Sequence, residues 1–218
     1  MADRIRVWDL PTRLFHWALV ACVAGLFLTS YVPGSWLEWH ARLGYTVVAL
    51  LLFRLLWGFV GGRWSRFAAF LYGPGSVGAY LRGHPHPDHL IGHNPLGAVS
   101  VFAMLGVLLA QAATGLVSDD ESAFTGPLNR FISTSKGLAA TWYHKQVGQW
   151  LLVALIVLHL LAVLYYVWGK KQNLVGPMVH GDKVTSHAAA GSRDDAASRL
   201  LALLVFAACA GAVAWLVR

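Results

Sequence analysis

Four histidines lie inside apolar stretches that are long enough to cross a membrane: His16, His40, His144 and His159. An imidazole ring is costly to place in hydrocarbon, so an ionisable residue at such a position is a candidate functional residue. Histidine is also the commonest metal ligand among protein side chains. The four residues therefore predict metal centres inside a membrane protein.

The four histidines fall at two depths when the apolar stretches are laid across a bilayer with the N-terminus inside. His144 and His159 are fifteen residues apart on one stretch, which is about 22 Å along a helix and leaves both on one broad face. His40 begins its stretch on the outer side and His16 begins its stretch on the inner side. The pattern predicts two bis-histidine sites, His40 with His144 and His16 with His159, built from facing helices.

Two histidines per site fit haem iron better than bare zinc. A structural zinc ion usually has four protein ligands, and no Cys or carboxylate lies at these depths. In haem the porphyrin supplies four nitrogens, so the protein adds two axial ligands. Cys22 and Cys209 belong to no C-x-x-C or C-x-x-C-H motif, which predicts a non-covalent haem. The chain also lacks the H-E-x-x-H motif of zinc proteases.

Two glycines and an arginine are candidate contacts to these haems. Gly44 and Gly148 each follow a predicted ligand by four residues. A missing side chain there leaves room for the edge of the ring, although such glycines also serve helix packing in membranes. Arg54 lies about 21 Å beyond His40 along a helix. It is expected to pair with propionates of the inner haem, the alternative being that it extends to the lipid headgroups.

His93 and Gln111 each have two interpretations. His93 precedes the third apolar stretch and either replaces His16 as the inner ligand or donates a hydrogen bond to a haem propionate; the second role is favoured. Gln111 either lines the outer haem pocket or bonds between helices. No residue is predicted to be catalytic.

The elements that must position these residues follow from composition. The chain has 218 residues, of which 57% are hydrophobic and 12% charged, against about 45–50% and 25% in soluble domains. This predicts an all-α integral membrane protein: a four-helix transmembrane bundle holding two haems, plus a fifth C-terminal transmembrane helix.

About 20 apolar residues make one span, and five stretches qualify: residues 15–33, 41–61, 95–117, 147–168 and 199–217. The fourth helix is expected to start earlier, near Thr141. Residues 1–183 are expected to form the di-haem core, 184–198 a flexible tether rich in small residues, and 199–218 an accessory helix.

The net charge of +7 does not indicate nucleic-acid binding, because the basic residues flank apolar stretches as topology signals. The basic loops are those before the first stretch, between the second and third, and after the fourth, which places the N-terminus in the cytoplasm.

Trp57 and Trp64 are expected in the inner interfacial belt. The loop over residues 61–93 is predicted to lie at the interface, with a short helix starting at Pro74.

Several motifs occur in an order that resembles the prokaryotic cytochrome b561 and nickel–iron hydrogenase b-type cytochrome family. From residue 7 to about 183 they are VWDLPTRLFHW, HARLGY, FRLLWGF, GHNPLGA, QAATGL, YHKQVG and LHLLAVLYY followed by KKQNLVGPMVHGDK. The resemblance implies a multi-pass protein of the bacterial inner membrane with two haem b groups, whose ligand positions carry over to His16, His40, His144 and His159. The fifth stretch exceeds the usual four-helix core of the family.

The resemblance also implies electron transfer between a periplasmic redox protein, such as a c-type cytochrome or dehydrogenase subunit, and the quinone pool. Bis-histidine haem has no open axial position, which favours electron transfer over oxygen chemistry. Three alternatives remain: a superoxide:quinone oxidoreductase, a membrane anchor subunit of a hydrogenase-like complex, and a cofactor-free membrane scaffold.

Overall fold

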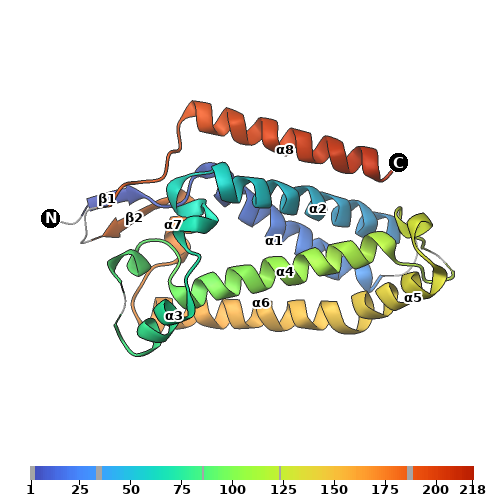
Figure 1. The fold of residues 1–218 in the computed structure, drawn as a ribbon, viewed down its shortest axis with the longest axis horizontal. Helices are drawn as coiled ribbons and strands as arrows, with labels where there is room; N and C mark the ends of the chain where they lie inside the picture. The colour runs from blue at the N-terminus through green and yellow to red at the C-terminus, as the bar shows by residue number, and fades with distance from the viewer. Residues whose placement is uncertain (1–2, 33–35, 85, 123, 186–188) are drawn as a thin grey trace. The chain divides into compact units, whose positions relative to one another are not determined.

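The computed structural model of the protein describes residues 3–32, 36–84, 86–122, 124–185 and 189–218. Within these residues, five helices are long and apolar enough to cross a membrane, and the predicted all-α membrane fold is confirmed (Figure 1). They are α1 (Leu10–Ser30), α2 (Trp36–Val60), α4 (Pro95–Val117), a continuous run over Thr134–Gly169, and α8 (Ala196–Leu216). The fourth run contains α5 (Thr134–Trp142), a π-helical segment (Tyr143–Gly148), α6 (Gln149–Leu164) and a second π-helical segment (Tyr165–Gly169).

The helix starts lie earlier than predicted in α1, α2 and the fourth run, because polar residues at the ends still belong to the helices. At α1 the reason is a capping carboxylate: Oδ1 of Asp9 accepts from the backbone N–H of Thr12 at 2.8 Å, the bond expected of an N-cap aspartate. Pro11 fits in the first turn of α1, where no N–H is required. Hydropathy alone locates the apolar centre of a helix and misses such a polar start.

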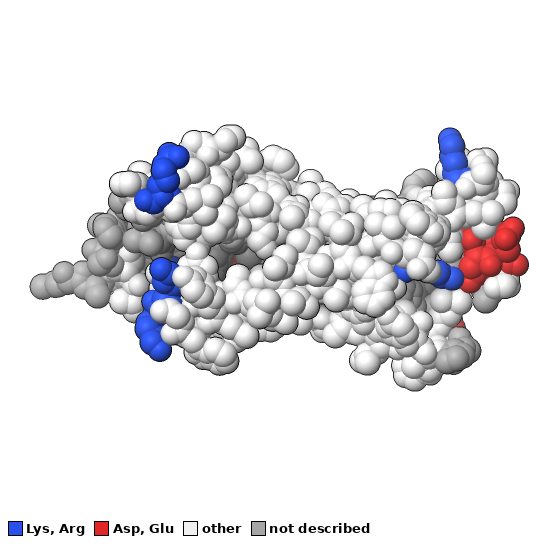
Figure 2. Space-filling model, turned by 90° about the horizontal axis from the view of Figure 1, so that it is seen from below, with Lys and Arg blue, Asp and Glu red and all other residues white. Residues whose placement is uncertain are grey.

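Shorter elements connect the long helices. They are α3 (Pro74–Leu81), α7 (Val175–His180), strands β1 (Asp3–Arg6) and β2 (Asp182–Thr185), and 3₁₀ turns at Arg63–Ser65, Phe67–Ala69, Pro87–Leu90 and Asn129–Phe131. The predicted helix start at Pro74 is confirmed, with proline in the first turn of α3. On the face drawn in Figure 2, the long helices present almost only uncharged side chains, as a surface against lipid requires.

The chain divides into two compact units that cut across the long helices. The first unit comprises Met1–Phe15, Arg54–Ala103 and Leu158–Val205, and the second comprises His16–Phe53, Met104–Val157 and Phe206–Arg218. Each unit therefore takes one part of every long helix together with the loops at its own end.

The first unit is organised around the N-terminal segment. β1 and β2 pair antiparallel, in a register that runs from Asp3 opposite Thr185 to Arg6 opposite Asp182. Val7 and Trp8, which follow β1 directly, pack with Trp64 and Ile91 in a buried apolar cluster. The strand pair was not predicted, because two four-residue strands of mixed polarity carry no clear period.

Two tryptophans of this unit are buried, and their predicted place in an interfacial belt is wrong. Trp57 is fully buried and Trp64 is 4% exposed. The indole N–H of Trp57 donates to the carboxylate of Asp9 at 3.2 Å, and that of Trp64 donates to the carbonyl of Ala190 at 3.0 Å. Buried indoles normally satisfy their N–H in this way, so here tryptophan marks the core of the first unit.

The segment before α8 is hydrogen-bonded, although its composition predicted a flexible tether over residues 184–198. Residues 184 and 185 belong to β2, and residues 186–188 lie outside the described residues. Beyond them, Ser192 is buried; its hydroxyl donates to the carbonyl of Val7 at 2.7 Å and accepts from the N–H of Trp64 at 3.1 Å. Small residues here permit close packing on the N-terminal segment, a role that composition cannot distinguish from flexibility.

A carboxylate in this segment connects it to the N-terminus and to the start of α8. Asp194 accepts from Arg6 at 2.8 Å, from the N–H of Leu10 at 3.1 Å and from Arg199 at 3.0 Å. Burial alone would raise the pKa of Asp194, but the hydrogen bonds from Arg199 and Leu10 and the positive charges of Arg199 and Arg6 lower it overall. The carboxylate therefore stays ionised between its cationic neighbours.

Replacing Asp194 by Ala is expected to lower the free energy of unfolding by about 2–3 kcal/mol, since charge-assisted hydrogen bonds are lost and, among the described residues, the Arg6 side chain keeps Asp182 alone as an acidic partner. Limited proteolysis in detergent should then cut near Asp194 faster than in the wild type. Glu38→Ala is the control, because Glu38 forms an exposed pair with Arg42, worth about 0.3–0.5 kcal/mol. Equal effects of both substitutions would contradict the expectation.

The second unit contains close contacts between its helices. A Cβ on Gly25 of α1 would lie 2.8 Å from Cδ1 of Leu43 on α2, so glycine permits this approach. Phe206 of α8 meets Phe53 of α2 edge to face, with ring centroids 6.0 Å apart. In this unit α8 is thus packed on α2, while its assignment as an accessory helix remains a prediction.

Candidate metal and cofactor site

His40 and His144 face each other in the second unit. His40 lies in the second turn of α2 and His144 in the π-helical segment before α6. Their ring centroids are 6.2 Å apart and the ring planes are inclined by 80°. Two imidazoles on opposite sides of one metal ion, with metal–nitrogen distances of about 2.0–2.1 Å, bring the centroids to about 6 Å. The separation therefore fits one metal ion between the two rings.

Hydrogen bonds to main-chain carbonyls orient both rings. Nδ1 of His40 lies 3.1 Å from the carbonyl oxygen of Leu26, and Nδ1 of His144 lies 2.9 Å from that of Gln111. A carbonyl only accepts, so each Nδ1 carries the proton and donates. Nε2 of each ring then keeps its lone pair for a metal. Metal-binding histidines almost always have such an outer partner, which fixes their tautomer and orientation.

The position of His144 in a π-helical segment was not predicted from the sequence. A π-helix has an i→i+5 pattern, is rare, and often marks a functional site. Here the segment Tyr143–Gly148 adds a wider turn at the place where the imidazole must turn toward α2. No residue type in YHKQVG signals this geometry, and a 3.6-residue period was the natural expectation.

The glycines near these rings play different parts. Apart from its chain neighbours and the backbone of its own helix, no atom of the described residues lies within 4 Å of a Cβ built on Gly44, so the space that a macrocycle edge would occupy is open there. A Cβ on Gly148 would collide with Oε1 of Gln111, so this glycine accommodates a side chain of α4. Gly115 was overlooked in the sequence: a Cβ there would lie 3.1 Å from Cε1 of His144.

Gln111 connects α4 to the π-helical segment, which matches the interhelical interpretation of this residue. Its Nε2 donates to the carbonyl of His144 at 3.0 Å. Its Oε1 is buried and has no hydrogen-bond donor among the described residues. A buried acceptor without a donor costs free energy. Besides its hydrogen bond between helices, Gln111 could therefore accept a hydrogen bond from a bound group.

In the first unit, Arg54 is a buried cation. It is 4% exposed, so it does not extend to the headgroups, and its guanidinium carbon lies 4.7 Å from the ring centre of Phe67. Its Nη1 has no hydrogen-bond acceptor among the residues that the structure describes. A buried charged donor without an acceptor is strongly unfavourable. The position therefore fits an anionic group that pairs with Arg54, as a haem propionate would.

His93 lies against aromatic rings close to Arg54. Its ring centroid is 4.7 Å from that of Trp8 and 4.5 Å from that of Phe70. Burial lowers the pKa of His93 to about 3, with smaller contributions from the positive charge of Arg54 and from His159. His93 is thus neutral, and its buried Nδ1 has no partner among the described residues. Both predicted roles of His93, propionate donor and inner ligand, remain compatible with this state.

The remaining two histidines belong to different units. His16 is part of the second unit, where its ring meets that of Trp17 edge to face at 5.0 Å. His159 is part of the first unit and acts electrostatically on His93. The pairing of His16 with His159 remains a prediction.

A haem fits the residues of the second unit better than a bare metal ion. In the described part of the chain, no three His, Cys, Asp or Glu side chains gather in a way that could hold a metal ion. Two imidazoles whose Nε2 atoms keep their lone pairs, and the open space at Gly44, would suit a haem, which brings four nitrogens of its own and needs room for its edge.

Comparison with known proteins identifies the family. The curated relatives include probable Ni/Fe-hydrogenase B-type cytochrome subunits from Rhizobium leguminosarum bv. viciae (23% identical; 83% of this chain and 89% of the relative), Escherichia coli strain K12 (25%; 80% and 88%) and Azotobacter vinelandii (25%; 81% and 87%). No solved structure matches the chain significantly. Residues 7–181 match the model of the prokaryotic cytochrome b561 family, and the chain therefore belongs to this family of membrane b-type cytochromes.

Proposed function

We propose that this protein is a di-haem cytochrome b that carries electrons between a redox partner at the outer face of the bacterial inner membrane and the quinone pool. Membership of the family supports the coarser statement that the chain is a membrane b-type cytochrome for electron transfer. The number of haems, their ligands, the quinone and the orientation are the proposed parts.

The observation that carries the proposal is the His40–His144 pair, with centroids 6.2 Å apart and both Nδ1 atoms hydrogen-bonded to carbonyls. His40 and His144 would hold one haem, and His16 and His159 the other. Haem b, when bound, supplies a reversible one-electron Fe³⁺/Fe²⁺ couple. If His40 and His144 both bound the haem iron, they would leave no position for small ligands such as oxygen, which would favour electron transfer.

The side chains of the first unit would neutralise the second haem. Arg54 offers a buried Nη1 and His93 a buried Nδ1, and neither atom has a hydrogen-bond partner in the described residues. Propionates are the acceptors that suit both groups, since an arginine pairs with a carboxylate in a bidentate manner. This arrangement favours the propionate role of His93 over its role as a ligand.

The orientation rests on loop charges. The first unit carries the basic loops, including Arg4, Arg63, Arg66 and Arg82. Positive loops remain on the cytoplasmic side, so we place these loops and the N-terminus at the inner face of the membrane.

The outer partner is proposed to be a hydrogenase-like subunit, a c-type cytochrome or a dehydrogenase subunit. The relatives named as hydrogenase cytochrome subunits favour the first of these. Superoxide oxidation needs a positive approach to the outer haem. Lys145 lies 3.9 Å from the carboxylate of Asp120, which cancels part of that field, so superoxide is the weaker alternative.

The test is spectroscopic. The purified protein in detergent should contain two haem b per chain by pyridine haemochrome assay, with low-spin absorbance bands in both oxidation states. Re-oxidation of the dithionite-reduced protein by a water-soluble quinone, and no reduction by superoxide, would support exchange with the quinone pool over the superoxide alternative. Properly folded protein without Soret absorbance would refute electron transfer and leave the scaffold.

A further inference from the structure

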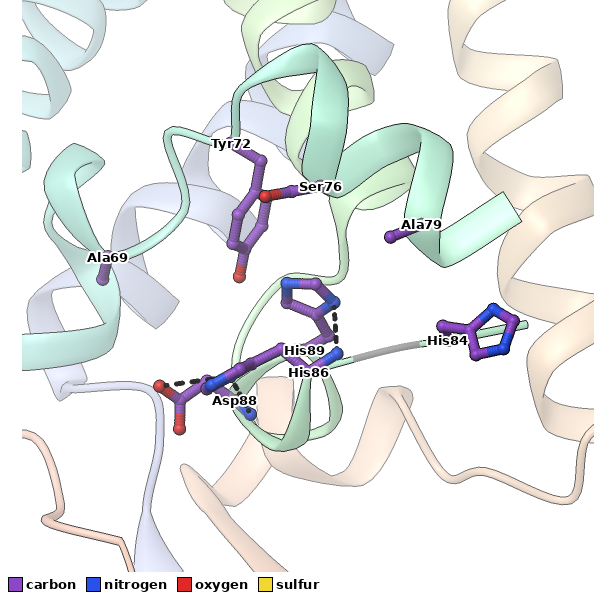
Figure 3. A pocket seen from close by; sticks show the side chains of 8 residues that line it. All are labelled: Ala69, Tyr72, Ser76, Ala79, His84, His86, Asp88 and His89. Atoms are coloured by element: carbon purple, nitrogen blue, oxygen red, sulfur yellow. Dashed lines mark hydrogen bonds and ion pairs between the residues drawn. The ribbon is translucent and has the colours of Figure 1, made fainter. Parts of the chain in front are cut away.

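A cavity of the first unit lies apart from the predicted haem ligands. Its volume is about 330 Å³, and its walls include Ala69, Tyr72, Ser76, Ala79, His86 and His89. Figure 3 shows these side chains around one space, with Ser76 and Ala79 coming from α3 and the two histidines from the turn that follows it. Two alanines are the small apolar part of the wall, and the rest, including the carboxylate of Asp88, consists of side chains that can hydrogen-bond, so the cavity suits a small ligand with polar groups.

His89 is the central polar group of this cavity. It is 7% exposed, and its Nδ1 accepts from the backbone N–H of His86 at 3.1 Å. Because Nδ1 is an acceptor, the proton of the neutral ring is on Nε2, which is a donor. Burial and the neighbouring His86 lower the pKa of His89, so the neutral ring is the form present at pH 7. Figure 3 shows the ring directed toward the space below Tyr72 and Ser76.

The surroundings of the cavity suit a ligand with a polar head and an apolar tail. Leu71 and Leu81, just before and at the end of this α3 region, are 71% and 65% exposed. Exposed leucines on an amphipathic segment indicate contact with the lipid interface. On the same segment Arg82 and His84 are exposed to water. The segment that carries the cavity wall therefore exposes both apolar side chains suited to lipid and polar side chains suited to water.

The cavity is also connected to the predicted redox site of the first unit. The hydroxyl of Tyr72 donates to the carbonyl of His93 at 2.9 Å, and the ring of His89 meets that of Tyr72 edge to face with centroids 4.7 Å apart. His93 in turn packs on Phe70, with centroids 4.5 Å apart. A short chain of contacts thus leads from the cavity wall to the neighbourhood of Arg54 and His159.

We propose that this cavity binds the headgroup of a quinone, with the Nε2–H of His89 donating a hydrogen bond to one of its carbonyl oxygens. The proposal rests on the proposed electron-transfer function and adds the place of exchange. Reduction of the quinone takes up two electrons and two protons and converts both C=O groups into C–O–H groups. The electrons are those that the cytochrome delivers; both protons come from water at the cavity mouth while the Nε2–H of His89 holds one carbonyl oxygen in place, and oxidation of a quinol reverses each transfer.

A metal ion is the other occupant that a group of histidines suggests. Within the described residues, no set of three potential ligands assembles here. Nδ1 of His86 accepts from the N–H of Asp88 at 3.2 Å and Nδ1 of His89 accepts from the main chain, so both nitrogens are already engaged. The single inward donor of His89 matches a carbonyl oxygen, which a metal ion does not offer.

The experiment measures binding of 2-n-heptyl-4-hydroxyquinoline N-oxide, a fluorescent quinol analogue, to the full chain in lipid nanodiscs by equilibrium dialysis. His89→Phe should weaken binding about tenfold, the loss expected for one hydrogen bond of about 1.4 kcal/mol. Ala79→Trp should weaken binding at least as much by filling the cavity without removing a polar group. Re-oxidation of the reduced protein by a water-soluble quinone should slow in both variants.

His180→Phe is the matched control. His180 is exposed in the same unit, and its Nδ1 likewise accepts from a backbone N–H, that of Asp182, at 3.2 Å. It should bind the analogue as the wild type does. Unchanged binding in His89→Phe and Ala79→Trp, or no binding by the wild type, overturns the assignment of the cavity. Haem content is measured on the same samples, so loss of the proposed electron-transfer function would be seen separately from loss of the site.

Discussion

Replacing His144 by Ala is expected to leave the purified protein with one haem per chain instead of two. The π-helical segment presents this ring to His40 with its Nδ1 bonded to the carbonyl of Gln111. Alanine removes the ligand, while the carbonyl of Gln111 keeps the hydrogen bond that it accepts from the hydroxyl of Thr114 at 3.0 Å. A haem with one protein ligand is held weakly and becomes accessible to solvent, whereas a haem held by the other two histidines is untouched.

His40→Ala should remove the same haem, and the double variant should lose no more than either single one. Pyridine haemochrome assays count the haems, and low-temperature absorbance spectra of the reduced protein show which band disappears. Free imidazole added during reconstitution should restore binding in both single variants, because it can occupy the position of the missing side chain. His180→Ala, exposed and remote in sequence from both ligands, should keep two haems. Loss of different bands in His40→Ala and His144→Ala would show that the two residues do not share a haem.

Replacing Asp9 by Ala is expected to cause the largest loss of stability among single substitutions in the first unit, about 3–5 kcal/mol. The carboxylate is fully buried and accepts from three donors: the N–H of Thr12 at 2.8 Å, the N–H of Gly62 at 2.9 Å and the indole of Trp57 at 3.2 Å. It also acts electrostatically on the buried Arg54. Alanine leaves all three donors unsatisfied and removes the N-cap of α1.

Unfolding of the detergent-solubilised protein, followed by tryptophan fluorescence, measures this loss. Asp9→Asn should be intermediate, because its amide keeps one oxygen acceptor but turns an NH₂ group toward donors. Glu38→Ala, which breaks only an exposed pair, should change the free energy of unfolding by less than about 0.5 kcal/mol. A stability of Asp9→Ala close to that of Glu38→Ala would mean that water replaces the carboxylate at these donors.

The His40–His144 pair was partly predictable from the sequence. Depth along helices is a property of residue spacing, so spacing alone assigns the two residues to one level, and the structure does bring their rings together. Tautomer and orientation depend on the carbonyls of Leu26 and Gln111, which lie on other helices and leave no mark in the sequence. Gly148 was expected to leave room for the edge of a haem, but in the structure it leaves room for the side chain of Gln111. The sequence could not show this, because only the packing of α4 decides which side chain fills that space.

Sequence alone determined the class of this protein, its long helices and its family, because membrane spans are set by local hydropathy and the family by ordered motifs, both of which are read along one chain. The helix of α3 at Pro74 also followed from a local rule. Tertiary structure decided the rest. In the folded protein the hydroxyl of Ser192 donates to the carbonyl of Val7, and the buried indole of Trp57 donates to the carboxylate of Asp9. The fold also places His89 beside Tyr72 in a cavity. These contacts join residues distant in sequence, and their free energy depends on which groups meet, which hydropathy and spacing do not encode.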